Sequence, residues 1–195
     1  IKSNRSIGLR LGVNGVFGNM GVAAAPLVIG LLLTIGDWRL CFVASGLFCI
    51  AYGVLFVLQL VEDASPPSKK VTKGVTGFAP GWQMALGAML MSTASGGFIF
   101  GAMTFVVPRY FEISLPTIST SVAVTGLLAS IVYAVASFSQ VGVGWLIDRV
   151  PPKWVLCTVG VGQVVFVALA ARFTDYALFF AMLIAMCFVF GQIPI

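Results

Sequence analysis

The sequence contains no histidine and only six acidic residues among its 195 positions. Without histidine, no imidazole is present to act as a general base or as a metal ligand. None of the six acidic residues lies inside a long apolar run; they are Asp37, Glu62, Asp63, Glu112, Asp148 and Asp175. We therefore expect no catalytic residues, no metal site and no enzyme activity.

Charged residues of both signs are also scarce. They make up 9% of the chain, against about 25% in an average globular protein. Hydrophobic residues make up 59%, and the mean hydropathy is +1.07. This much apolar surface needs lipid to cover it, which excludes a soluble enzyme, a disordered chain and a disulfide scaffold. We interpret the net charge of +5 as basic membrane-flanking loops rather than as a nucleic-acid-binding surface.

The sequence instead contains long runs of residues without any charged side chain. A helix needs about 20 residues to cross a bilayer, and six runs of 18 to 35 residues satisfy this: 11–35, 40–61, 74–108, 113–147, 154–171 and 176–195. A β-barrel would show short alternating segments instead. The sequence therefore predicts an all-α, polytopic helical membrane protein with six transmembrane helices.

The distribution of lysine and arginine predicts the orientation. Alternating spans place three basic residues on one side, Arg39, Arg109 and Arg172. The other side has eight, Lys2, Arg5, Arg10, Lys69, Lys70, Lys73, Arg149 and Lys153. The side with eight is predicted to be cytoplasmic, in a plasma or inner membrane. Because the chain starts with isoleucine and stops without flanking charge, we expect it to be an internal piece of a longer protein.

The first span has a nearly side-chain-free face. Asn14, Gly18, Gly21 and Ala25 recur at helical spacing, and such a face allows another helix to approach closely. Pro26 follows and is expected to bend the helix. A generic packing face explains this stretch equally well.

A second signature joins the fourth and fifth spans. Gly144 precedes Asp148 and Arg149 by one turn, and Lys153 follows. We expect Asp148 near the start of the next helix, where a carboxylate suits the positive dipole end. Arg149 and Lys153 would hold the loop at the cytoplasmic face. The alternative is an ordinary charged turn.

These signatures resemble the major facilitator superfamily (MFS) of secondary transporters. The first span is similar to the family's fifth helix, with Gly21, Pro26 and Gly30 in place and Ala25 and Ile29 replacing two glycines. The Gly144–Lys153 stretch resembles the loop between helices eight and nine. The resemblance implies helices 5–10 of twelve, with helices 1–4 and 11–12 as missing partners. It divides the chain into helices five and six (1–61), a cytoplasmic central loop (62–80) and helices seven to ten (81–195).

The resemblance also implies which helices line a central cavity. The polar candidates for contact with solute on these helices are Ser92, Ser95, Tyr133, Ser137, Gln140, Gln192 and Asn14. Small polar residues also join membrane helices without any other role. The candidates for conformational gating are Gly21, Ala25, Pro26, Gly30, Gly144, Asp148, Arg149 and Lys153.

The function that these features favour is secondary active transport of a small solute across the lipid bilayer by alternating access. The fifth-helix pattern favours proton-linked efflux, with an uptake symporter or uniporter as the alternative within the family. Since no acidic residue lies mid-span, coupling to a proton or sodium gradient would reside in the missing helices. We expect no bound cofactor. A membrane-embedded enzyme or a scaffold is the alternative of another class.

Overall fold

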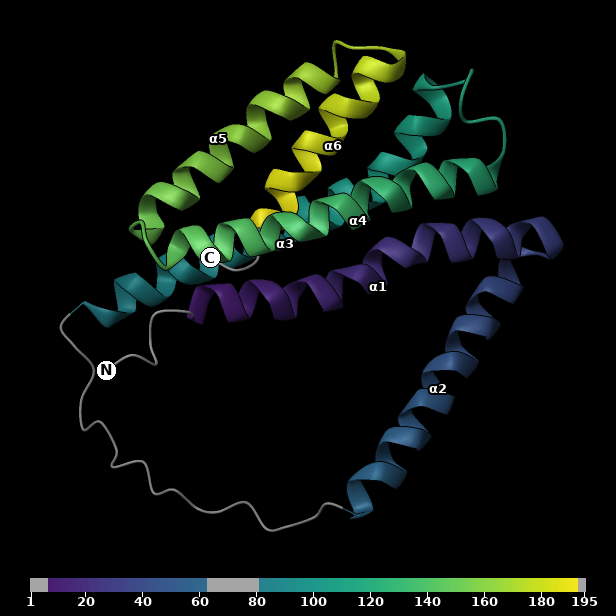
Figure 1. Cartoon of the computed structure of the whole chain (residues 1–195), viewed down its shortest axis with the longest axis horizontal. Coiled ribbons are helices and arrows are strands. Elements are labelled where there is room, and N and C mark those ends of the chain that lie inside the picture. The colour runs from purple at the N-terminus through teal and green to yellow at the C-terminus, as the bar shows by residue number, and fades with distance from the viewer. Residues whose placement is uncertain (1–6, 63–80, 193–195) are drawn as a thin grey trace.

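The computed structural model describes residues 7–62 and 81–192, which form six α-helices and no strand (Figure 1). The helices are α1 (Ile7–Ile35), α2 (Trp38–Glu62), α3 (Trp82–Ser114), α4 (Val122–Ile147), α5 (Pro152–Ala170) and α6 (Asp175–Gly191). The all-α prediction is confirmed. The predicted central loop at 62–80 lies outside the described residues except for Glu62, which ends α2.

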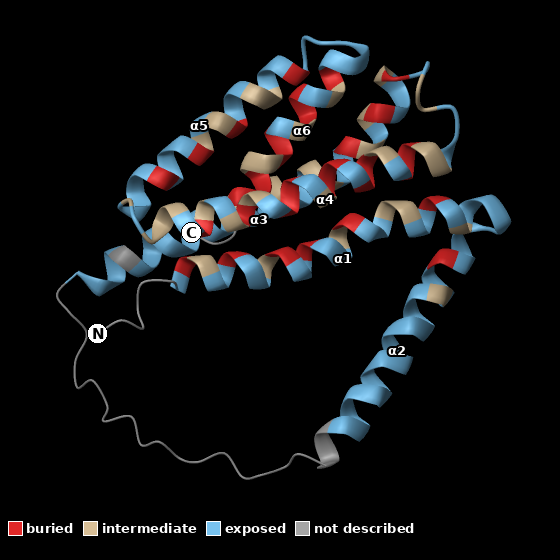
Figure 2. Ribbon diagram, in the orientation of Figure 1, coloured by how far each residue is buried: buried red, intermediate tan, exposed pale blue. Residues whose placement is uncertain are grey.

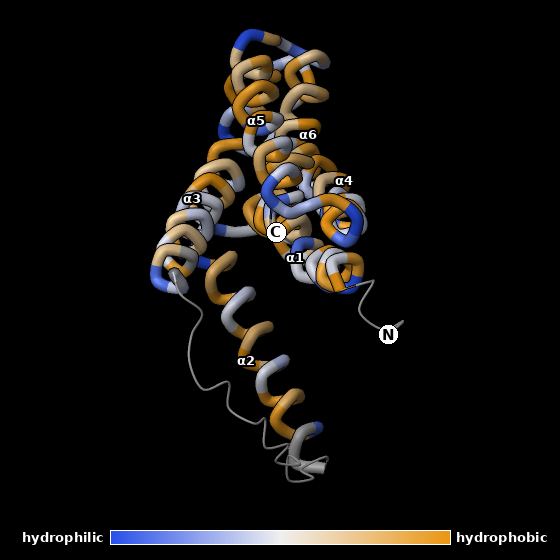
Figure 3. Tube along the Cα trace, turned by 90° about the vertical axis from the view of Figure 1, so that its left-hand side faces the viewer, coloured by the Kyte–Doolittle hydropathy of each residue, from blue (hydrophilic) through white to orange (hydrophobic). Residues whose placement is uncertain are grey.

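The helices have the length and surface of membrane spans. Helices α1 to α5 are long and apolar enough to cross a bilayer, and α6 is an apolar helix of 17 residues. Most of the described residues are exposed (Figure 2), and much of the chain is hydrophobic (Figure 3). Phe98 and Phe105, for example, are 79% and 81% exposed. Exposing so large an apolar surface to water is unfavourable, whereas lipid tails can cover it.

Helix α4 lies at the centre of the fold. It packs along α1 on one side and against α6, α3 and α5 on the other (Figure 1). Since lipid is as apolar as the side chains, close packing rather than escape from water holds these helices together. The core lies among α3, α4 and α6, and its largest fully buried side chains include Tyr133, Phe111, Phe190, Leu115, Leu178 and Met186.

Helix α2 projects away from the other helices (Figures 1 and 3). It contacts α1 near the turn that joins them, where the Cys41 thiol lies 3.9 Å from the Ile29 carbonyl oxygen. Large apolar side chains cover all its sides and are mostly exposed. The direction of α2 is thus set by α1 alone among the described residues.

Helix α3 differs from the predicted span, which ended at Pro108. The helix continues through this proline to Ser114, and Arg109 donates to Glu112 at 2.6 Å along the same helix. Both side chains are more than half exposed, so the pair is a surface ion pair. A charge-free run does not mark a helix end where two opposite charges three residues apart stabilise the last turns.

We call the end of the bundle where α1 begins and α4 ends the Asp148 end. The opposite end, where α1 ends and α4 begins, is the Pro108 end.

Candidate functional site

Helices α1 and α4 run antiparallel in a contact that we call the α1–α4 seam. Their backbones touch at the Asp148 end, where a β-carbon added to Gly8 would overlap the Gly144 carbonyl oxygen, and one added to Gly144 would overlap that of Gly8. At the other end Gly30 lies against Val122, since its added β-carbon would be 3.0 Å from the Val122 oxygen. Only glycine allows so close an approach.

The face of α1 that forms the seam is not the predicted small face. Gly18 and Gly21 have no described atom within 4 Å of an added β-carbon, and Asn14 and Ala25 are exposed. The buried face next to it carries Gly8, Gly12, Val16, Asn19, Ala23 and Gly30. Glycine and alanine occur on several faces of α1, so small size alone did not select the packed one.

Asp148 binds the beginning of α1. Its two carboxylate oxygens accept hydrogen bonds from the Gly8 and Leu9 backbone amides at 2.9 and 3.0 Å. The expectation that Asp148 would serve the next helix is wrong. Helix α5 begins with Pro152, which has no amide hydrogen to donate. The carboxylate meets the free amides and positive dipole end of α1 instead.

The two basic residues of this loop lie over aromatic rings. The Arg149 guanidinium carbon is 3.6 Å from the centre of the Trp145 ring, and the Lys153 ammonium is 5.7 Å from the Trp154 ring. A cation over an indole face is held by the ring quadrupole. These contacts fix the position of the loop on α4 and α5.

Helix α4 also satisfies the backbone next to the two internal prolines. Pro108 has no amide hydrogen, which leaves the Thr104 carbonyl of α3 without its helical donor. The Tyr133 hydroxyl donates to that carbonyl at 2.8 Å. One turn away, the Ser130 hydroxyl accepts from the Leu27 amide at 3.0 Å, directly after Pro26 of α1. Ser130 and Tyr133 of α4 therefore join this helix to α1 and α3.

A cavity of about 640 Å³ lies between α1, α3 and α4 at the Pro108 end. Four predicted residues line it: Ala25, Pro26, Gly30 and Tyr133. The rest of its wall is mainly apolar, with the paired Arg109 and Glu112 also in the lining. The hydroxyl hydrogens of Tyr133 and Thr104 are already donated to backbone carbonyls. The lining thus offers apolar contact and a balanced charge pair.

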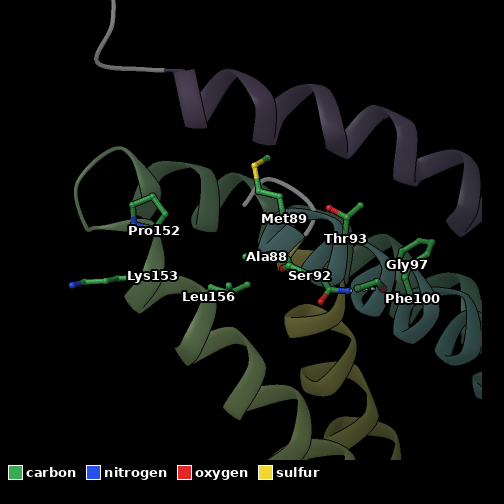
Figure 4. Close-up of a pocket in the computed structure, with 11 residues that line it drawn as sticks. Ala88, Met89, Ser92, Thr93, Gly97, Phe100, Pro152, Lys153 and Leu156 are labelled. Atoms are coloured by element: carbon green, nitrogen blue, oxygen red, sulfur yellow. Dashed lines mark hydrogen bonds between the residues drawn. The ribbon is translucent and has the colours of Figure 1, made fainter. Parts of the chain in front are cut away.

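A second cavity of about 580 Å³ lies among α3, α5 and α6 (Figure 4). Three predicted residues line it: Ser92, Lys153 and Gln192. The Gln192 amide donates to the Gly96 carbonyl at 3.0 Å and accepts from Gln163 at 2.9 Å, so it links three helices. Gln163 was not a candidate for solute contact. It is buried in this network and serves the packing of the helices.

The remaining candidates lie outside both cavity linings. Ser95 is exposed on α3. Ser137 and Gln140 are fully buried in α4, and the Ser137 hydroxyl donates to the Tyr133 carbonyl of its own helix at 2.7 Å. The Gln140 amide lies against Gly15 of α1. The structure thus separates the predicted set into cavity-lining residues, seam residues and residues in neither place, such as Asn14, Gly21 and Ser95.

The comparison with known families decides what this bundle is. The sequence model of the Major Facilitator Superfamily matches residues 3–195. The chain belongs to this superfamily. No curated protein and no solved structure matches the chain. Members of the superfamily are membrane transporters, so the chain is a multi-pass integral membrane protein of a transport family.

Proposed function

We propose that this protein is a secondary transporter that moves a small solute by alternating access. In this proposal α1 and α2 are helices five and six, which close the N-terminal half, and α3 to α6 are helices seven to ten. The α1–α4 seam then joins the two halves of the transporter. The observation that carries the proposal is the Asp148 carboxylate on the first turn of α1, because it ties one half to the other across the seam.

The Asp148 end is the cytoplasmic end in this proposal. Arg10, Arg149 and Lys153 lie at that end, and basic residues are retained on the cytoplasmic side of a plasma or inner membrane. The carboxylate tie would therefore close the cytoplasmic side in one state and release it in the other. Pro26 and the uncovered face with Gly18 and Gly21 would act as the hinge or seal between the halves.

The solute site is proposed at the cavity between α1, α3 and α4. Its mostly apolar lining with Tyr133 and Thr104 suits a solute with substantial apolar surface. The second cavity, with Ser92 and Gln192, is the other place where solute would contact the C-terminal half.

We propose that the transporter exports its solute and that this export is linked to a proton gradient. The support for this proposal is the partial antiporter pattern on α1, with Gly21, Pro26 and Gly30. The described helices hold no acid away from their ends, so the titratable group would belong to another part of the transporter. Uptake or uniport by the same fold is the second candidate, and the same lack of an intramembrane acid favours the uniporter.

Substitution of Asp148 tests the proposal. Asp148→Asn keeps the size of the side chain but removes its charge, which weakens the contact with the α1 amides by about 1–2 kcal/mol. We expect about 5- to 30-fold slower solute flux in proteoliposomes. Asp37→Asn, an exposed acid beside α2, is the matched control and should leave the flux unchanged. Normal flux by an Asp148→Asn protein that inserts normally would count against a gate at this end, whereas absence of flux in the parent protein would favour a scaffold or an enzyme.

A further inference from the structure

Gln140 is completely buried in the α1–α4 seam, and its amide is unpaired. Its side chain is 0% exposed, and neither Nε2 nor Oε1 has a hydrogen-bond partner among the residues that the structure describes. A β-carbon added to Gly15 would overlap the amide oxygen, so the amide lies directly against α1. A side-chain amide has two N–H donors and two acceptor lone pairs. Gln140 uses none of them among the described residues, and Asn19 on the facing helix α1 also has a buried Nδ2 without a partner there.

The other polar side chains of α4 near the seam are satisfied. Ser130 accepts from the Leu27 amide, and Ser137 donates to the Tyr133 carbonyl. Close to Gln140 the backbones leave no gap, because a β-carbon on Gly12 would overlap the Gln140 carbonyl oxygen. The amide has therefore lost water in this closed seam without gaining a partner, a penalty equivalent to about a 5- to 150-fold change in an equilibrium constant.

We propose that Gln140 opposes closure of the Asp148 end of the seam and thereby sets the balance between the two states of the transporter. Water reaches the amide when this end opens and is expelled when it closes. Asp148 acts in the other direction, because its contact with Gly8 and Leu9 exists only in the closed end. The Gln140 penalty and the Asp148 contact thus make opposite contributions of similar size to the free energy of closure. Both the open and the closed state therefore stay populated. The inference rests on the proposed alternating access.

Distance measurements on the intact protein in lipid test this assignment. Spin labels at Leu11→Cys and Phe138→Cys occupy positions 54% and 61% exposed on the two helices, after the four native cysteines are replaced. Gln140→Met removes the unpaired amide at similar volume, so the ratio of closed to open should rise about 5- to 150-fold. Gln140→Glu should lower it, because a carboxylate is harder to bury than an amide.

The opposite signs separate this role from general damage to the packing. Ser139→Ala is the matched control, since its hydroxyl donates to the Cys187 carbonyl at 2.7 Å within the α4–α6 contact and should not move the ratio. An unchanged ratio in the Met variant, or a shift of Met and Glu in the same direction, would overturn the role of Gln140. If the Met variant does not insert, the sign of the Glu variant decides alone. A single distance in every variant would contradict alternating access itself.

Discussion

Tyr133 shows how one side chain stabilises a proline in a neighbouring helix. Its ring is buried and stacks on Phe190 at 5.9 Å, and its hydroxyl takes the place of the amide donor that Pro108 lacks. The sequence marked Tyr133 as a candidate for contact with solute. It did not indicate the Thr104 carbonyl, because a backbone acceptor leaves no trace in the pattern of residue types.

Tyr133→Phe should therefore destabilise the helix bundle. The Thr104 carbonyl would remain buried without a donor, which costs about 1–3 kcal/mol. Thermal unfolding in detergent measures the loss. Tyr110→Phe is the matched control, because its hydroxyl is 3.4 Å from the Ala170 carbonyl, a weak contact that should matter much less. Equal stability of the Tyr133→Phe protein and the parent would show that the bond contributes nothing.

Gly12 and Gly15 should differ sharply in their tolerance of alanine. A β-carbon on Gly12 meets the Gln140 backbone, so α1 and α4 must separate, at a cost of about 1–3 kcal/mol. A β-carbon on Gly15 meets only the Gln140 side chain, which can rotate away, and alanine gains about 1 kcal/mol of helix propensity over glycine. Thermal unfolding of the two variants should show a loss for Gly12→Ala and near-neutrality for Gly15→Ala. The reverse order would contradict the register of the seam.

At the scale of elements, hydropathy predicted the helices but not their contacts. Membrane crossing requires long apolar runs, which is why all six helices were found from composition and length. Tyr133, Ser137 and Gln140 of α4, which the sequence offered as candidates for solute contact, are buried inside the bundle, because lipid offers polar groups no partners.

The packed face of α1 and the partner of Asp148 were not predicted. Both depend on which helix lies opposite, and that is a property of the three-dimensional arrangement. The spacing of Gly8, Gly12 and Gly15 was a usable signal for the seam, since these glycines form a close-packing face of their own. The carboxylate of Asp148 followed the available amides of α1 rather than its sequence neighbours.

At the scale of the whole molecule, α1 meets α4 along a seam with a carboxylate contact at one end and a cavity beside the other. The backbones of α1 and α4 touch at both ends of the seam, because a β-carbon on Gly126 would overlap the Pro26 carbonyl oxygen at the Pro108 end. The cavity of about 640 Å³ lies beside that contact, between α1, α3 and α4. A movement that separates the Asp148 end of the seam and narrows this cavity would be the physical content of alternating access.

The distances at the two ends of the seam test this central claim most directly. One spin-label pair, Leu11 with Phe138, reports the Asp148 end, and a second, Ile29 with Phe105, spans the cavity between α1 and α3 at the Pro108 end; all four positions are exposed. In lipid, the account predicts two distances for each pair, with the Asp148→Asn variant lengthening the first pair and shortening the second. One fixed distance for each pair, unmoved by Asp148→Asn, would contradict the account.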